Sequence, residues 1–179
     1  MHYVIIVVVI SLIVVPLFSI LPSARQRQQM KMRQTARAAG VSVDLVTIDD
    51  PNPDQDKYIS HSGQRIPPRL QVMGYRIQRR PDPGWRVLHE IQWCLKRELD
   101  GSWHWVLKGP QLSPELINFI DASKGLLPED MIKVEESSYG IIIYWHERTA
   151  GTEDDVLNFL QKCAELPPWD LTLGDLEER

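Results

Sequence analysis

Apolar and polar residues are spaced along most of the chain in patterns that predict a mixed α and β domain over residues 41–166. Alternating apolar and polar residues predict five strands: VSVDLVTID, LQVMGYRIQRR, SWHWVL, MIKVEE and YGIIIYWHE. SPELINFIDAS predicts a helix with Ser113 as its N-cap and Pro114 at the first position, and a last helix is predicted from about Thr152. Strands interrupted by helices are typical of an α+β fold, with a largely antiparallel sheet and two or three helices packed on one face.

Some details of this pattern stay open. Residues 85–99, WRVLHEIQWCLKREL, satisfy both strand alternation and helical spacing. The Asp100-Gly101 pair after them favours a strand that turns back into SWHWVL as a hairpin. Residues 49–68 consist of turn formers and predict a long loop, and Gly74 suggests a bulge in its strand.

The start of the chain has a different pattern, with nineteen uncharged and mostly apolar residues from Tyr3 to Leu21. At about 1.5 Å per helical residue they span roughly 28 Å, close to the hydrocarbon thickness of a bilayer. Because a cationic n-region is missing and a cleavage site is only weakly indicated, we expect a retained transmembrane anchor at residues 1–22. Residues 23–40 are good helix formers and predict a basic juxtamembrane helix or stalk, in which the membrane helix could simply continue.

Charge predicts the orientation of this anchor. By the positive-inside rule a cationic flank lies in the cytoplasm, so the N-terminus is expected outside and the domain inside the cell. Five cations form this flank, with no acidic residue among them: Arg25, Arg27, Lys31, Arg33 and Arg37. They are also candidates for contact with lipid headgroups. The predicted location is therefore the inner membrane of a bacterial cell.

Beyond residue 40 the chain is acidic, with fifteen Lys and Arg against twenty-four Asp and Glu, a net charge of about −9. Phosphate neutralisation needs clustered positive charge, so no nucleic-acid partner is expected. About 140 residues suffice for one domain with its own core, and residues 167–179 predict an acidic tail. Cys94 and Cys163 are too few for a thiolate metal site or a disulfide framework.

The sequence contains no complete catalytic or metal-binding motif. Two His-Glu dipeptides, at 89–90 and 146–147, begin like a zinc-protease motif, which needs a second histidine four residues after the first. Trp93 and Ala150 occupy those positions. A glycine-rich phosphate loop and a nucleophile elbow are also missing, so we expect a non-enzymatic protein without a cofactor.

An arginine-rich stretch is a candidate ligand site. Six arginines and one carboxylate lie between residues 65 and 86, and guanidinium groups suit phosphate. RIQRR resembles the Arg-x-x-x-Arg motif of the cyclic-di-GMP-binding PilZ family, and DGS at 100–102 is similar to the start of that family's second motif, although Trp105 replaces its last glycine. This limited resemblance implies an anionic ligand at Arg76, Arg79 and Arg80. The alternative is a solvated strand face whose arginines pair with carboxylates.

The six tryptophans all follow the predicted anchor. Trp103 and Trp105 share a strand face, for which core packing is the first interpretation and anchoring of a partner peptide the second. Trp169, between two prolines and an acidic run, is a candidate docking element or folds back onto the domain.

Two functions follow as hypotheses. The leading one is a single-pass membrane protein with a cytoplasmic interaction domain, an accessory subunit or adaptor of a bacterial inner-membrane complex. In layout alone it resembles small inner-membrane anchors of cell division and protein translocation, which also join an N-terminal span to a cytoplasmic part. The alternative is a membrane-tethered sensor that binds an anionic nucleotide or metabolite through the arginine cluster.

Overall fold

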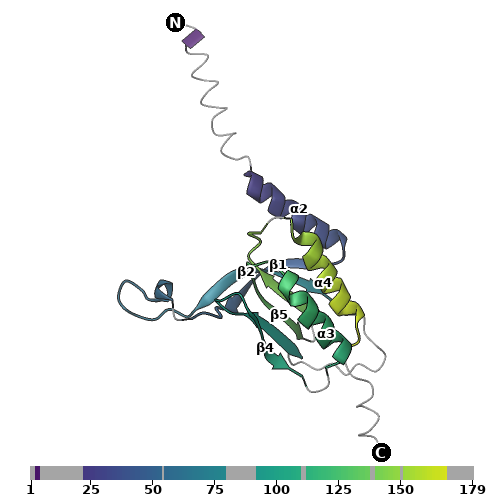
Figure 1. The fold of residues 1–179 in the computed structure, drawn as a ribbon. Coiled ribbons are helices and arrows are strands. Elements are labelled where there is room, and N and C mark those ends of the chain that lie inside the picture. Colours follow the sequence, from purple (N-terminus) through teal and green to yellow (C-terminus); the bar gives the residue numbers. More distant parts are fainter. Residues whose placement is uncertain are drawn as a thin grey trace, which may run out of the picture.

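A six-stranded antiparallel sheet confirms the expected α+β fold (Figure 1). The computed structural model describes residues 3–4, 22–53, 55–79, 92–109, 112–137, 140–149 and 151–168. Within these ranges the order of the main elements is α2 (Ala24–Ala38), β1 (Ser42–Asp49), β2 (Arg69–Ile77), β3 (Trp93–Arg97), β4 (Trp103–Lys108), α3 (Pro114–Ser123), β5 (Met131–Ser137), β6 (Gly140–Trp145) and α4 (Glu153–Glu165). Short 3₁₀ turns span Asp56–Tyr58 and Lys124–Leu126.

The strands lie in the order β1-β2-β6-β5-β3-β4, and every neighbouring pair is antiparallel. Figure 1 shows α2, α3 and α4 together on one face of this sheet. The main core lies between the two layers and contains one or more apolar side chains from each helix: Met32, Ala36, Leu116, Ile120, Val156 and Leu160 packed with Tyr75, Trp93, Ile143 and Trp145.

Local sequence signals explain several of these elements. Ser113 caps α3 as expected, because its side-chain oxygen accepts a hydrogen bond from the backbone N–H of Leu116 at 3.2 Å. Gly101 has a φ of +85° in the turn that joins β3 to β4, which confirms the predicted hairpin. The described part of the ambiguous segment is a strand, β3, while residues 85–91 lie outside the described residues.

Two details of β1 and β2 differ from what the strand pattern suggests. Leu45 shares the face of the buried Val43 by alternation but is 65% exposed, whereas Val46 packs on the opposite face. Gly74 makes no bulge, since the pairing of β1 with β2 runs through it without interruption. It instead provides space: a β-carbon there would lie 3.2 Å from the side chain of Val46.

The predicted basic helix is present as α2. Ser23 has extended backbone and forms a capping box with Gln26, so α2 has its own N-terminus. Met32 and Ala36 are 2% and 0% exposed, so α2 packs against the domain and is not a free stalk. Residues 5–21 of the predicted anchor lie outside the described residues, and no helix among the described ones is long and apolar enough to cross a bilayer.

Gly140, at the start of β6, gives a test of this packing. Its φ is +105°, and a β-carbon would lie 2.3 Å from the carbonyl oxygen of Ile77. We expect Gly140→Ala to lower the free energy of unfolding by about 3 kcal/mol or more, since strain and a backbone clash add. Gly151→Ala is the matched control. Gly151 also has a positive φ, +76°, but a β-carbon there meets no other described part of the chain within 4 Å, so we expect the free energy of unfolding to fall by only about 1 kcal/mol. Denaturant unfolding in detergent, followed by tryptophan fluorescence, measures both, and equal losses would contradict the clash.

Candidate functional site

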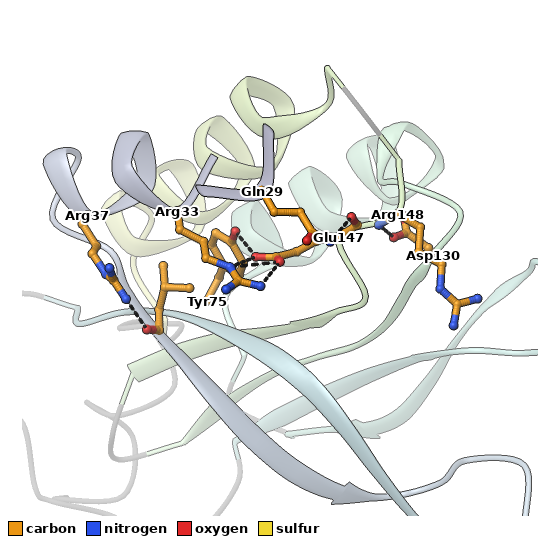
Figure 2. Close-up of polar contacts among 8 residues, drawn as sticks. Gln29, Arg33, Arg37, Tyr75, Asp130, Glu147 and Arg148 are labelled. Atoms are coloured by element: carbon orange, nitrogen blue, oxygen red, sulfur yellow. Dashed lines mark hydrogen bonds and ion pairs between the residues drawn. The ribbon is translucent and has the colours of Figure 1, made fainter. Parts of the chain in front are cut away.

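Glu147 is a buried residue of the loop that follows β6, at the junction between the sheet and α2 (Figure 2). It is 3% exposed and has a φ of +55°, a conformation that costs free energy for a residue other than glycine. Asp130 holds this loop in place. Its carboxylate accepts hydrogen bonds from the backbone N–H of Arg148 and, at 2.5 Å, from the hydroxyl of Thr149, while its carbonyl accepts from the N–H of His146 at 3.3 Å.

Both carboxylate oxygens of Glu147 have charged or hydroxyl donors. The hydroxyl of Tyr75 on β2 donates to Oε1 at 2.6 Å. Arg33 on α2 donates from Nε to both oxygens at 2.9 and 3.0 Å, and from Nη2 to Oε2 at 2.5 Å. The side-chain amide of Gln29 donates to the Glu147 carbonyl at 3.1 Å. We call these four residues the Glu147 clamp; they join the basic helix, the sheet and the loop.

The donors of the clamp keep their protons at neutral pH. Hydrogen bonding to Glu147 raises the pKa of the Arg33 guanidinium further above its ordinary value. Burial raises the pKa of Tyr75 above 10.0, and the hydrogen bond to Glu147 adds to the rise. The hydrogen bonds that Arg33 and Tyr75 donate to Glu147 therefore persist at neutral pH.

The clamp divides the five basic candidates of the predicted juxtamembrane segment. Arg33 is turned to the domain, and Arg37 donates from Nη2 to the carbonyl of Val43 on β1 at 3.2 Å, although its surface stays largely exposed. Arg25, Arg27 and Lys31 are exposed. The sequence thus identified the segment, but the structure assigns its cations different roles.

The structure does not bring Arg76 and Arg79 into one site. Arg79 is 8% exposed, and its Nε lies 2.7 Å from the Glu136 carboxylate, which also accepts from Trp93 Nε1 at 2.6 Å. Arg76 lies on β2 opposite Ile142, on the sheet face away from the helices. Arg80 lies outside the described residues. A ligand phosphate could reach Arg79 only by displacing Glu136, so the predicted anion site does not form from Arg76 and Arg79.

The guanidinium of Arg79 also fixes the end of α4. Its Nη1 donates to the backbone carbonyls of Ala164 and Leu166. Carbonyls at a helix C-terminus lack partners within the helix, so this contact satisfies groups that would otherwise be unpaired.

Trp103 and Trp105 lie half-buried against the main core, which favours the packing interpretation. The indole N–H of Trp105 donates to Asp121 on α3 at 3.1 Å, and the Lys108 ammonium lies 5.3 Å from the centre of its ring. The Arg97 guanidinium lies 5.6 Å from the centre of the Trp103 ring. Trp169 lies outside the described residues.

Beside the clamp, the loops at one end of the sheet enclose a polar groove of about 930 Å³. Two of its carboxylates are engaged in holding loops: Asp130 as above, and Asp50, which accepts from the Tyr58 hydroxyl and lies 2.9 Å from the Lys57 ammonium. Burial, together with the nearby Arg148, lowers the pKa of His146, another lining residue. Among the described residues no group of three or more His, Cys, Asp or Glu side chains is placed to hold a metal ion.

Sequence reasoning missed most of the clamp. The sequence marks Glu147 only through its His-Glu dipeptide, and it marks Tyr75 only as part of a predicted strand. Nothing in the local sequence marks the burial of Glu147, its left-handed backbone or the role of Asp130. Arg33 was found through its charge, but as a topology signal rather than as an ion-pair partner.

The clamp predicts how α2 is held. Glu147→Gln removes the negative charge opposite Arg33, so we expect α2 to detach more often, with hydrogen exchange of the Met32–Ala36 amides at least about tenfold faster. The amides of β5 and β6 should keep their protection. Glu165→Gln, which breaks the exposed pair with Lys162, is the control and should leave α2 unchanged. Unchanged α2 exchange in Glu147→Gln would show that burial of Met32 and Ala36 alone holds the helix.

The hydrogen bonds of Asp130 predict that the free energy of unfolding falls at acid pH. Burial alone would raise its pKa, but hydrogen bonds led by that from Thr149 hold it below the ordinary value of 3.8. Because the folded pKa is the lower one, this group contributes its full stability above about pH 4, and the contribution is lost as the pH falls through the folded pKa. We expect Asp130→Asn to cost about 1–2 kcal/mol at neutral pH and to flatten the loss below about pH 4. Urea unfolding at a series of pH values measures this, and parallel curves for variant and wild type would contradict it.

Known proteins provide no further guide to this site. Comparison of the chain with protein-family models, with the sequences of curated proteins and with solved structures finds no match. The functional reading therefore depends on the residues of this chain and on their geometry.

Proposed function

We propose that the chain is a single-pass membrane-anchored interaction protein, an accessory subunit or adaptor of a bacterial inner-membrane complex. Its N-terminus is outside and its domain lies in the cytoplasm. The observation that carries the proposal is the Glu147 clamp, which docks on the domain a basic helix that directly follows a nineteen-residue apolar run.

The clamp supports a short connection between the anchor and the domain. Only Pro22 and Ser23 separate the apolar run from α2, which starts at its own N-cap. Arg33 is ten residues beyond Ser23, roughly 15 Å along the helix. Because α2 is docked on the domain, only Pro22 and Ser23 connect the apolar run to the folded unit, and so short a connection keeps the domain close to the membrane surface.

The distribution of charge supports the same orientation. Arg25, Arg27 and Lys31 are exposed in the first turns of α2, where each cation contributes roughly 1 kcal/mol of attraction if it lies near anionic lipid. The chain beyond residue 40 carries a net charge of about −9 and is repelled by the same surface. The start of the helix thus faces the headgroups and the acidic domain faces away.

Tethering supplies the mechanism, without a catalytic step or a cofactor. A partner in the same membrane meets the domain at a high effective concentration, so contacts that are weak in solution suffice for capture. The short connection increases this effect, because it keeps the binding surface of the domain near the membrane.

Thiol labelling tests the topology. Ser62 is exposed on the loop between β1 and β2, while Cys94 and Cys163 are buried, so Ser62→Cys creates one accessible thiol. We expect a membrane-impermeant maleimide to label it only after permeabilisation of the inner membrane, and the unsubstituted chain to stay unlabelled. Labelling of Ser62→Cys with the inner membrane intact would contradict the cytoplasmic location, and recovery of the full chain without membrane would contradict the anchor.

A further inference from the structure

An apolar groove lies between α3 and α4, on the helical layer of the domain. Its volume is about 420 Å³, and two of its lining residues, Phe119 and Phe159, stack with ring centres 5.7 Å apart. Phe159 and Leu127 are almost fully buried beneath it. Leu126, on the 3₁₀ turn after α3, also lines the groove but is 74% exposed. The groove therefore has room for a large apolar side chain and an exposed leucine beside it.

The surroundings of the groove are acidic. Asp155, Glu165 and Lys162 lie on its rim, and Lys162 is already 3.2 Å from Glu165. Among the described residues no Lys or Arg lies within ion-pair distance of Asp155. Over α3, the turn after it and α4 there are six carboxylates and two lysines: Glu115, Asp121, Glu153, Asp154, Asp155 and Glu165 with Lys124 and Lys162. An occupant must therefore combine apolar anchors with positive charge.

We propose that this groove binds a basic amphipathic helix from the cytoplasmic flank of another inner-membrane protein. A helix presents apolar side chains at i, i+3/i+4 and i+7 to such a groove and keeps its lysines and arginines at the rim. The proposal rests on the membrane-anchored cytoplasmic function proposed above. Under that function the partner's charge follows from the positive-inside rule, which makes the cytoplasmic flanks of membrane helices rich in Lys and Arg.

Two other occupants fit the groove less well. An anionic lipid surface is repelled by Asp155 and Glu165 on the rim and by the excess of carboxylates on α3 and α4. The chain's own basic helix, α2, is engaged elsewhere on the domain through Met32, Ala36 and the Glu147 clamp. A partner helix with the opposite charge brings both the apolar contact and the electrostatic complementarity that the groove offers.

A synthetic peptide tests the groove on the full chain in detergent micelles. The probe is a sixteen-residue fluorescent helix with Leu and Phe on one stripe and Lys elsewhere, compared with the same stripe carrying Glu and with a Lys peptide of scrambled order. We expect anisotropy to show binding of the Lys helix only, with an affinity that falls as salt is added. Equal binding of the Glu or scrambled peptide would overturn the proposal.

Matched variants locate the binding. Leu126→Asp and Asp155→Lys change exposed groove residues and should each weaken binding by about tenfold, with a smaller salt dependence for Asp155→Lys. Leu99→Asp and Glu129→Lys change exposed residues outside the groove and should leave the affinity unchanged. Unchanged affinity in both groove variants would overturn the assignment.

Two further outcomes separate this inference from the proposed function. If sedimentation shows a dimer that Leu126→Asp converts to a monomer, the groove is an interface between copies and the partner helix is excluded as its occupant. If the Lys helix fails to bind while Ser62→Cys labelling places the domain in the cytoplasm, the groove proposal is overturned and the membrane-anchored function is retained.

Discussion

The buried carboxylate of Glu147 is the group on which the placement of α2 depends. Removing a carboxylate from water costs several kcal/mol unless charge and hydrogen bonds compensate it. Here the compensation comes from Tyr75 on β2 and Arg33 on α2, and the loop that carries Glu147 is held by Asp130. The backbone of Glu147 is in the left-handed region, so part of this stabilisation offsets local strain. Helix, strand and loop thus form one joint, and each element needs the other two.

A second arginine–glutamate pair, Arg79 and Glu136, lies at the opposite end of the sheet. Arg79 and Glu136 have side chains 5% and 1% exposed, and the same guanidinium donates to carbonyls at the end of α4. One such pair therefore fixes α2, and the other fixes the C-terminus of α4. Between them the helical layer is held to the sheet by apolar packing. This is why an arginine that looks available for phosphate in the sequence is unavailable in the fold.

The joint brings opposite charges together in one folded unit. The exposed cations of α2 lie at its start, next to the predicted anchor, while α3 and α4, which flank the apolar groove, carry an excess of carboxylates. A membrane surface would attract the cationic start of α2, whereas a basic partner helix would bind beside the carboxylates of α3 and α4. Because α2 is docked rather than free, its orientation toward the bilayer would also set the orientation of the groove.

The sequence by itself determined the features that depend on neighbours in the chain. The Ser113 cap, the Asp100-Gly101 turn, the strand segments and the amphipathic last helix all follow from spacing and capping over a few residues, and so does the α+β class. Alternation places Leu45 on the face of Val43 but does not show that it stays exposed, because the extent to which a strand face is covered depends on where a helix crosses it.

Only the tertiary structure decided the pairing of the charges. Glu147 lies 114 residues from Arg33 and 72 from Tyr75, and Glu136 lies 57 residues from Arg79. Local sequence cannot show which of many arginines and carboxylates meet across such separations, or which of them leave the solvent. Burial and partner choice arise when the whole sheet and its helices pack together, and for this reason the charge of Arg33 was visible in the sequence while its role was not.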